Sequence, residues 1–304
     1  MKTDVLIIGS GISGLTAGVY ALRYGLDVYL CDFSYPGGQI ALAPEIENYP
    51  PLYGINGDEF CLKLADWYRK NGGTINSEKV LSVGKINGDF LVTTNKNRIF
   101  AKAVIAANGA KRNTLGCIGE NEFIGKGISW CAQCDGLFFK DKKVAVIGGG
   151  NTALGEALHL SELCETVYII VRKNTFKASP VMVEKIKEKS NIKVFMKHTV
   201  HRFIGSSMLE AVELKADDDS LKTLNVSGVF EAIGSVPDNS MFISLAEFDS
   251  FGYIITNKYC RTLTPGLYAV GDNRSVRYRQ LVTAAADGCV AASECYKYIL
   301  GIPD

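Results

Sequence analysis

The sequence predicts an α/β protein made of two similar domains, the second inserted in the first. Three observations predict this fold class. The chain has 304 residues, which is enough for two domains of ordinary size. The stretch VLIIGSGISGLTA at 5–17 returns as VAVIGGGNTALGEA at 144–157. The tail, beginning with GLYAVGD at 266–272, adds a strand, a Gly-Asp turn and a helix without a glycine motif of its own, so we expect it to complete the first domain.

Each glycine-rich stretch indicates how its domain begins. A short β-branched apolar run predicts a strand, closely spaced glycines a tight turn, and the following residues a helix. The first glycine permits the turn, the second lets the backbone approach a pyrophosphate, and the third, or a small alanine, lets the helix pack closely. Both copies therefore predict Rossmann-like nucleotide-binding domains with three ββα layers, although glycine turns also occur for purely structural reasons.

The context of the first copy favours nucleotide binding. Gly9, Gly11 and Gly14 precede a helix and then the strand LDVYLCDF, whose end carries Asp32. An acidic side chain at this place accepts hydrogen bonds from ribose hydroxyls. The alternative is a structural turn with a surface aspartate.

The second copy differs at the ribose position. Its small residues are Gly148, Gly150 and Ala153, and its second strand TVYIIVRKNTFK ends in cations: Arg172, Lys173 and, shortly after, Lys177. Positive charge there suits a 2′-phosphate, so the sequence favours NADPH over NADH. A solvated basic strand end is the alternative.

The remaining elements are one helix and two meanders. The helix is expected over 58–73, with Asp58 near its start and Gly72 near its end. Short antiparallel meanders are expected from the strands at 89–94 and 98–107, and again from those at 208–215 and 221–233. The expected boundaries are 1–113 and 242–304 for the first domain and 114–241 for the second.

Composition excludes several classes of partner. The chain is 47% hydrophobic, and 33 basic against 32 acidic residues leave a net charge of +1, so we expect neither nucleic-acid nor membrane binding. Asp4 interrupts the N-terminal apolar run, which ends at Gly9, so no secretion signal is predicted. We expect a cytoplasmic protein, whose nine cysteines form no structural disulfide framework.

The stretch SWCAQCDG at 129–136 holds two cysteines, Cys131 and Cys134, spaced to meet. A lone Cys-x-x-Cys is compatible with half a zinc site, buried thiols or a redox centre. Zinc needs four ligands, and the three histidines are not spaced to supply the rest. A thiolate at a helix start is the nucleophile that a redox centre needs. Asp135 suits a proton donor or a helix cap.

The ordered motifs resemble the low-molecular-weight thioredoxin reductases of bacteria over essentially the whole chain. They are GSGISG, GGQ at 37–39, IENYP at 46–50, CAQCDG, GGGNTA, GVFEAIG, GLYAVGD and RQ at 279–280. The resemblance implies FAD held by the first and last parts of the chain and NADPH held by the middle. Carried over by position, the FAD residues are Gly9, Gly11, Gly14, Asp32, Gly38, Gln39, Asn48, Ala107, Gly109, Gly271, Asp272, Arg279 and Gln280.

The resemblance also implies the roles of the redox residues. Cys134 faces the flavin, Cys131 attacks the disulfide of thioredoxin, and Asp135 supplies a proton. It implies a homodimer, and a swing of one domain against the other about segments near 112–116 and 240–246. Alternatives are a related flavin disulfide reductase or dithiol oxidase with another donor, such as NADH or ferredoxin, or another partner. A nucleotide-binding regulatory module with incidental thiols is a further alternative.

Two departures from the family pattern bear on the cofactors. The family's Ala-Thr-Gly reads Ala107, Asn108 and Gly109, which changes a hydroxyl near FAD. The usual His-Arg-Arg signature with a later Arg appears as Val171, Arg172, Lys173 and Lys177, where lysine keeps the charge without the bidentate fork. Retention of GGGNTA favours a nucleotide donor over ferredoxin.

Overall fold

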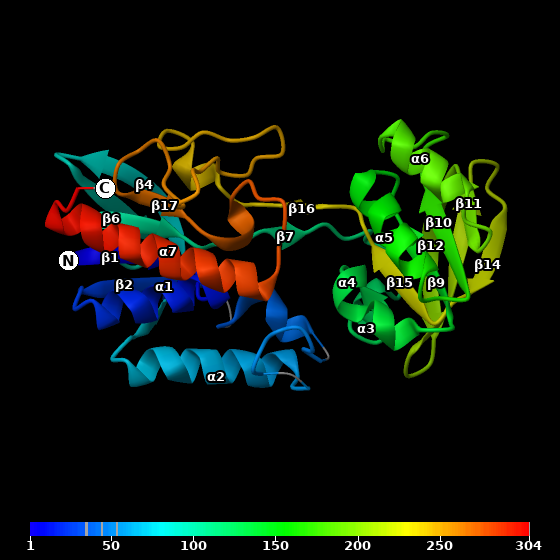
Figure 1. Cartoon of the computed structure of the whole chain (residues 1–304), viewed down its shortest axis with the longest axis horizontal. Coiled ribbons are helices and arrows are strands. Elements are labelled where there is room, and N and C mark those ends of the chain that lie inside the picture. The colour runs from blue at the N-terminus through cyan, green and yellow to red at the C-terminus, as the bar shows by residue number, and fades with distance from the viewer. Residues whose placement is uncertain (34–35, 44, 53, 304) are drawn as a thin grey trace. The chain divides into compact units, whose positions relative to one another are not determined.

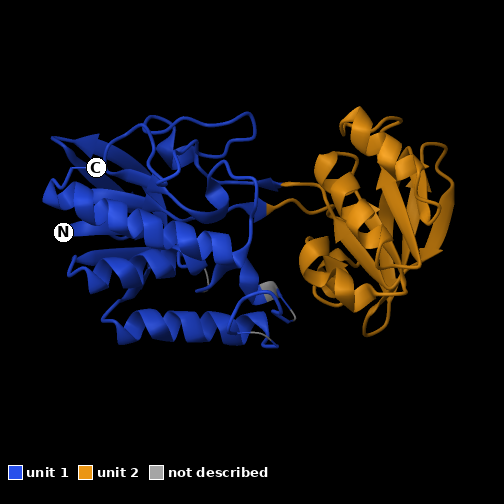
Figure 2. Cartoon of the chain, viewed as in Figure 1, with its two compact units in different colours: residues 1–111, 235–304 blue, residues 112–234 orange. Residues whose placement is uncertain are grey.

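The chain folds into two units, each built around a sheet with parallel strands at its centre (Figures 1 and 2). The computed structural model describes residues 1–33, 36–43, 45–52 and 54–303. The first unit holds Met1–Lys111 and Ser235–Asp304, and the second unit holds Arg112–Gly234. The second unit is therefore inserted in the first. The two crossings, at 111/112 and 234/235, lie before the boundaries 113/114 and 241/242 expected from the sequence.

The sheet of the first unit has a parallel centre and an antiparallel edge. Apolar runs such as VLII in β1 are buried, as strands between two covering layers require. Across the sheet the order is β3 (Ile75–Ser77), β2 (Val28–Asp32), β1 (Lys2–Ile8), β6 (Arg98–Ala106), β5 (Asp89–Thr94) and β4 (Val80–Ile86), with β17 (Leu267–Ala269) also paired to β6.

Strand β6 is where the first unit becomes three-layered. Its residues 98–101 pair antiparallel with β5, and its residues 104–106 pair parallel with β17 from the tail. One hydrophobic cluster lies between the sheet and the helices, and a second lies on the meander side. The tail thus completes the first sheet, as the sequence predicts.

Three helices cover the sheet of the first unit: α1 (Ile12–Arg23), α2 (Gly57–Lys70) and α7 (Leu281–Leu300). The side chain of Asn56 caps α2 by accepting the N–H of Glu59, and acidic residues begin the helix while basic residues end it. Helices α1 and α7 approach closely because Gly288 has no side chain: a Cβ there would lie 2.2 Å from the Ser13 carbonyl oxygen.

The second unit repeats the plan with a fully parallel sheet. Its order is β11 (Ile192–Met196), β10 (Thr166–Val171), β9 (Lys143–Ile147), β15 (Gly228–Glu231) and β8 (Ile128–Ser129). A separate antiparallel sheet holds β12 (His198–Gly205), β13 (Leu209–Ala216) and β14 (Leu221–Asn225). The helices are α3 (Glu120–Phe123), α4 (Ala132–Asp135), α5 (Asn151–Ser161) and α6 (Pro180–Lys187).

The strand expected over 221–233 is two strands in different sheets. Strand β14 pairs with β13, whereas β15 pairs with β9 and β8. The chain leaves the antiparallel sheet after Val226, whose N–H donates to the Glu210 carbonyl. It enters the parallel sheet at Gly228, where a Cβ would lie 2.5 Å from the Phe139 ring. The single strand expected from the sequence therefore spans a change of sheet.

The two connecting segments pair as a short ribbon of β7 (Lys111–Arg112) and β16 (Ser235–Val236). The expected hinge at 240–246 lies after this crossing. There η3 (Ser240–Phe242) carries Phe242, which is fully buried in the core of the first unit. Among the described residues, no helix combines the length and the apolar character needed to cross a bilayer.

Candidate active site

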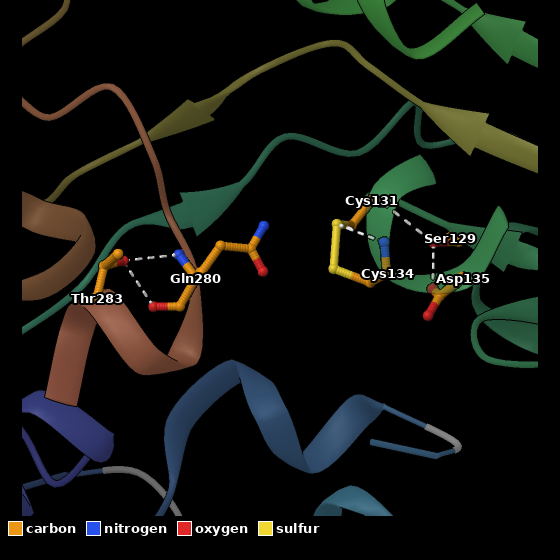
Figure 3. Close-up of a disulfide and its surroundings, with 6 residues drawn as sticks. All are labelled: Ser129, Cys131, Cys134, Asp135, Gln280 and Thr283. Carbon is orange, nitrogen blue, oxygen red and sulfur yellow. Dashed lines mark hydrogen bonds between the residues drawn. A yellow bond between two sulfur atoms is a disulfide. The ribbon is translucent and has the colours of Figure 1, made fainter. Parts of the chain in front are cut away.

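The two cysteines of SWCAQCDG are joined by a disulfide within the second unit (Figure 3). Helix α4 is a single turn between them, and it brings the two Cα atoms to 5.3 Å. Cys131 lies at the N-cap, and its Sγ accepts the N–H of Cys134 at 3.2 Å. Among the described residues, no three or more metal-ligating side chains are grouped together.

The helix that carries Cys134 is one turn long. Helix α4 ends at Asp135, and the chain continues as the 3-10 turn η2 (Gly136–Phe139). A macrodipole needs several aligned turns, so the support for a sulfur charge here comes from the individual N–H of Cys134.

Asp135 lies in a small polar cluster with the residue that precedes the motif (Figure 3). Ser129 Oγ donates to Asp135 Oδ2 at 2.5 Å and accepts the N–H of Cys131 at 3.1 Å. Burial raises the pKa of Asp135, while the Ser129 hydrogen bond and the charge of Arg112 lower it in part. As the residue before η2, Asp135 makes no side-chain cap. The cap alternative is therefore not realised, and the buried carboxyl is suited to hold a proton.

A second carboxyl, which the sequence analysis missed, contacts the helix from the other side. Glu156 of α5 accepts a hydrogen bond from the N–H of Ala132, the residue after Cys131. Burial raises the pKa of Glu156 to about 7, against the lowering effects of that bond and of Arg112. Its Oε2 is buried without a hydrogen-bond partner among the described residues. A signal existed: Glu156 follows the buried Ala153 by three residues, on the buried side of α5.

The nucleotide turn of the second unit is closely packed. A Cβ on Gly148 would lie 2.5 Å from the Ala232 carbonyl oxygen and 3.0 Å from the Ala153 Cβ. Gly150 is the N-cap of α5 and makes no side-chain cap, so the first N–H groups of the helix are open to an anion.

The three predicted cations lie just after β10 and are exposed: Arg172, Lys173 and Lys177. The N–H of Lys177 donates to the Gly149 carbonyl at 2.7 Å, which returns this segment to the glycine turn. None of the three forms an ion pair with a described residue, so their charge is available for a phosphate group.

The glycine turn of the first unit has the same tight form. A Cβ on Gly9 would lie 2.3 Å from the Ala107 carbonyl oxygen, and one on Gly14 would lie 2.0 Å from the Gly9 carbonyl oxygen. Asp32, at the end of β2, faces this turn: its Oδ2 accepts the N–H of Ser10 at 2.6 Å and the Oγ of Ser10 at 2.7 Å.

The predicted flavin-side residues come from several loops. Gly37 bridges to Gly11, which places Gly38 beside the first glycine turn. Gln39 in η1 (Gly38–Leu42) donates from its Nε2 to the Ala110 carbonyl, next to Gly109. Asn48 is exposed in a loop.

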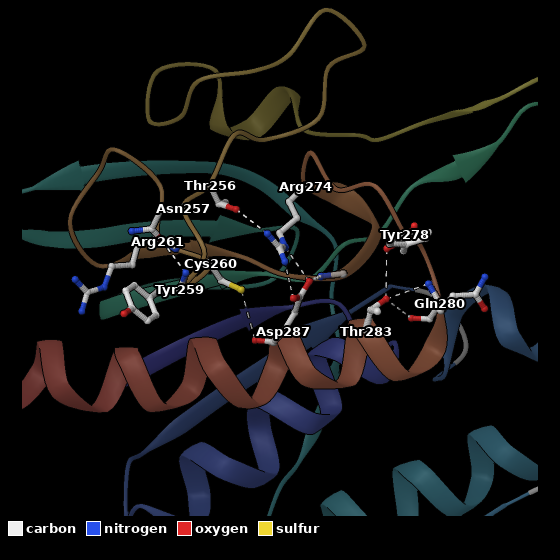
Figure 4. A network of polar contacts seen from close by, with 11 residues as sticks. Thr256, Asn257, Tyr259, Cys260, Arg261, Arg274, Tyr278, Gln280, Thr283 and Asp287 are labelled. Atoms are coloured by element: carbon white, nitrogen blue, oxygen red, sulfur yellow. Dashed lines mark hydrogen bonds and ion pairs between the residues drawn. The ribbon is translucent and has the colours of Figure 1, made fainter. Parts of the chain in front are cut away.

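The Gly-Asp turn of the tail is held by a polar network from α7 (Figure 4). Gly271 and Asp272 begin the 3-10 turn η4 (Gly271–Asn273), and the N–H of Gly271 donates to Asp287 Oδ2 at 3.0 Å. Arg274 binds both oxygens of Asp287, at 2.8 and 2.6 Å, and donates to Thr256 at 3.0 Å. The sequence analysis missed this Arg274–Asp287 pair, which is separated by thirteen positions across a loop and a helix.

The remaining predicted positions lie at the start of α7. Gln280 is the N-cap, in a reciprocal capping box with Thr283. The guanidinium of Arg279 stacks on the ring of Tyr253 at 4.1 Å, and its Nε is buried without a partner among the described residues. Asn108, which stands where the family has threonine, forms two side-chain hydrogen bonds. Its Oδ1 accepts from Asn273 Nδ2 at 2.8 Å, and its Nδ2 donates to the Asp238 carbonyl.

The residues of the first unit fit a bound dinucleotide. At Gly9 and Gly14 a side chain would collide with the protein's own backbone, so these glycines permit the tight turn into α1 that a pyrophosphate site needs. Asp32 would be the acceptor for a ribose, and the buried Arg279 Nε would be a donor. This donor set matches FAD, with phosphates at one end and a polar ring at the other.

Comparison with known proteins agrees with this geometry. The family described as pyridine nucleotide-disulphide oxidoreductase matches residues 3–288. The chain therefore belongs to the pyridine nucleotide-disulphide oxidoreductases, and this membership implies FAD and NADPH as cofactors.

Within that family the similar proteins are thioredoxin reductases. The chain is 37% identical over 306 residues to the thioredoxin reductase of Rickettsia prowazekii, covering 98% of this chain and 99% of that protein. It is 37% identical over 298 residues to that of Treponema pallidum, covering 97% of each. The crystal structure of thioredoxin reductase from Streptococcus pyogenes superposes with a TM-score of 0.95 at 32% identity, covering 99% of each chain. These similarities confirm the resemblance drawn from the motifs.

Proposed function

We propose that the chain transfers electrons from NADPH through FAD and the Cys131–Cys134 couple to the disulfide of thioredoxin. The observation that carries the proposal is the disulfide itself, which spans one helical turn beside a buried carboxyl. Overall, NADPH, one proton and oxidised thioredoxin give NADP⁺ and the thioredoxin dithiol. FAD, when bound, accepts a hydride from NADPH and passes on two electrons.

The chain's own residues divide the remaining steps. Reduction of the disulfide leaves Cys131 and Cys134 as a dithiol. The Cys131 thiolate attacks one sulfur of the thioredoxin disulfide, and the other thioredoxin sulfur leaves with a proton, which we assign to Asp135. Cys134 then attacks Cys131 in the mixed disulfide, so the ring closes and the second thioredoxin sulfur leaves. The N–H of Cys134, which already contacts Cys131 Sγ, favours the attacking thiolate.

Cofactor binding is assigned to both units. In the first unit, we assign FAD to the glycine turn and to residues at or after the ends of β2, β6 and β17. These residues are Gly9, Gly11, Gly14, Asp32, Gly38, Gln39, Asn48, Ala107, Gly109, Gly271, Asp272, Arg279 and Gln280. In the second unit, we assign NADPH to Gly148, Gly150, Ala153, Arg172, Lys173 and Lys177. Support comes from the close-packed turns and from the unpaired cations after β10.

The proposal extends to assembly and location. We infer a cytoplasmic homodimer that binds neither nucleic acid nor membranes, in which the unit carrying the dithiol swings about the two connecting segments. The near-zero net charge and the resemblance to thioredoxin reductases support these inferences.

The test is turnover with defined substrates. Purified protein with FAD should oxidise NADPH only when oxidised thioredoxin is present, and it should release free thiols in a ratio of about two per NADPH, as a two-electron couple requires. NADPH oxidation without thioredoxin reduction, or turnover only with NADH or a ferredoxin, would point instead to a related flavin disulfide reductase.

A further inference from the structure

A glutamate ends a strand that is otherwise hydrophobic. All four residues of β15 are buried, and the last, Glu231, is 2% exposed. Glu231 pairs with Ile147, directly before the glycine turn at Gly148. A carboxyl group buried this deeply is costly unless its oxygens find partners or it keeps a proton.

The partners of Glu231 are an indole and a second acid. Its Oε2 accepts a hydrogen bond from Trp130 Nε1 at 3.0 Å. Its Oε1 is buried and receives no N–H or O–H from a described residue. The neighbouring polar group is the carboxyl of Glu120, so the two acids form a hydrogen bond only while one of them keeps its proton.

Glu120 is held by backbone donors. It is 2% exposed and begins α3. Its oxygens accept three backbone N–H groups, from Leu115 at 2.8 Å, Gly116 at 2.6 Å and Cys117 at 3.2 Å. Among the described residues, Glu231 accepts only the Trp130 indole, and its Oε1 has no donor. Glu231 is therefore the member of the pair that has room for the shared proton.

The pair joins three segments that bear on the redox centre. Glu120 clamps residues 115–117, which follow the first crossing between the units, and Glu231 precedes the second crossing at 234/235. Trp130 precedes Cys131 in the chain, and its ring stacks against the guanidinium of Arg112 at 4.6 Å. The charge of Arg112 in turn lowers the pKa of both Asp135 and Glu156.

We propose that Glu231 is a positioning residue of the redox centre: it keeps a proton that it shares with Glu120, and this proton holds Trp130 and residues 115–117 in place. The geometry makes the arrangement sensitive to pH. Burial and the charge of Glu120 raise the pKa of Glu231 to about 8, against the lowering effect of the Trp130 hydrogen bond.

Loss of the proton places two negative charges side by side in a buried site. The groups that face them are few: Glu120 from α3, the thiol of Cys117, whose own pKa burial and the two carboxyls raise to about 12, and Arg112 beyond the indole. None of these supplies a second proton near neutral pH. Above pH 8 the two carboxylates therefore repel, and we expect Glu231 to move away from Glu120 and to draw the hydrogen-bonded Trp130 with it.

A direct test uses the protein without turnover. Infrared difference spectra of the wild-type protein between about pH 6 and pH 9.5 should show a protonated carboxyl lost near pH 8, in addition to the one that Glu156 loses near pH 7. Trp130 fluorescence should change with the loss near pH 8 in a Trp67→Phe background. Glu231→Gln should abolish the loss near pH 8 and the fluorescence change, because an amide can donate to Glu120 and accept from Trp130 without titrating. Glu122→Gln, an exposed substitution on helix α3 beside Glu120, should leave the infrared and fluorescence changes intact.

A wild-type protein with no carboxyl lost near pH 8 would overturn the proposal, as would a loss near pH 8 that persists in Glu231→Gln. The infrared measurement on the wild-type protein needs no variant, so it can still contradict the proposal if Glu231→Gln fails to fold.

The consequence for catalysis rests on the proposed function. At pH 7 the two proteins should reduce thioredoxin at similar rates, and by about pH 9.5 the ratio of wild type to Glu231→Gln should fall several-fold. Equal ratios at both pH values would contradict the positioning role while leaving the shared proton intact. Absence of any thioredoxin reduction in both proteins would instead contradict the proposed function.

Discussion

Ser129 and Asp135 are joined by a hydrogen bond of 2.5 Å that spans the disulfide-bearing turn, and the same Ser129 oxygen accepts the N–H of Cys131. One hydroxyl therefore connects the carboxyl of Asp135 to the backbone of Cys131, to which we assign the attack on thioredoxin. Because the Ser129 bond lowers the pKa of Asp135 while burial raises it, the pair sets how tightly the carboxyl keeps its proton.

Asp135→Asn should slow thioredoxin reduction about 10²-fold or more, because an amide cannot transfer the proton that the leaving sulfur takes. Flavin bleaching by NADPH should be unchanged, since that step precedes thiol exchange. Stopped-flow measurement of the two half-reactions checks both statements. Equal slowing of both half-reactions would mean a structural role for Asp135.

Ser129→Ala should move the pH profile without removing the acid. Loss of the hydrogen bond removes a lowering influence, so the pKa of Asp135 rises further and its proton persists to higher pH. The alkaline limb of the thioredoxin-reduction profile should therefore shift upward. An unshifted or downward-shifted limb would show that Asp135 is not the group that titrates.

Glu156→Gln should change the pH dependence of stability. The folded-state pKa of Glu156, about 7, lies above its ordinary value, so the stability that the protonated form supplies is present below about pH 4.5 and is lost as pH rises through 7. The glutamine variant does not lose it. The variant should gain roughly 1–3 kcal/mol over the wild-type protein between pH 5 and 8, measured by thermal unfolding. A pH-independent difference would contradict this assignment.

Asp287→Ala should weaken the hold of the first unit on FAD. The substitution frees the N–H of Gly271 and leaves the half-buried Arg274 without its carboxylate, which costs about 3–5 kcal/mol for a buried pair. We expect a lower flavin content after gel filtration and a lower melting temperature. Glu59→Gln, which breaks the exposed pair with Lys63, should change stability by less than about 1 kcal/mol and leave flavin content intact.

Arg172→Ala should reduce the preference for NADPH over NADH. A charge-assisted hydrogen bond to a phosphate contributes about 1.5–3 kcal/mol, so the KM for NADPH should rise roughly 10-fold to 100-fold while that for NADH changes little. Steady-state kinetics with both coenzymes checks this. An equal rise in the KM values for NADPH and NADH would show that Arg172 does not bind the 2′-phosphate specifically.

The parts of the site that could be predicted from sequence are those set by local chain geometry. Gly9, Gly14 and Gly148 are required by backbone that approaches within contact of another backbone, and Cys131 and Cys134 meet because one helical turn separates them. These constraints act over a few residues of the chain, so the spacing of the glycines and cysteines in the sequence is enough to predict them.

The parts that could not be predicted depend on packing between distant segments. Glu156 reaches Ala132 because α5 packs on α4, and Arg274 meets Asp287 only when η4 folds back on α7. The change of sheet between β14 and β15 was missed too, because the chain passes between the two strands in only two residues, 226 and 227, although β14 is mostly exposed and β15 is buried. Glu231 stands in the motif GVFEAIG, but its neighbour Glu120 lies 111 positions away in the sequence, so the pair could not be predicted.

The central claim is that electrons pass through the Cys131–Cys134 couple, and Cys134→Ser tests it most directly. Under anaerobic conditions the variant should bleach its flavin on addition of NADPH as fast as the wild-type protein. It should then fail to reduce thioredoxin, because Cys131 alone can form a mixed disulfide but cannot resolve it. Undiminished thioredoxin reduction by this variant would contradict the account.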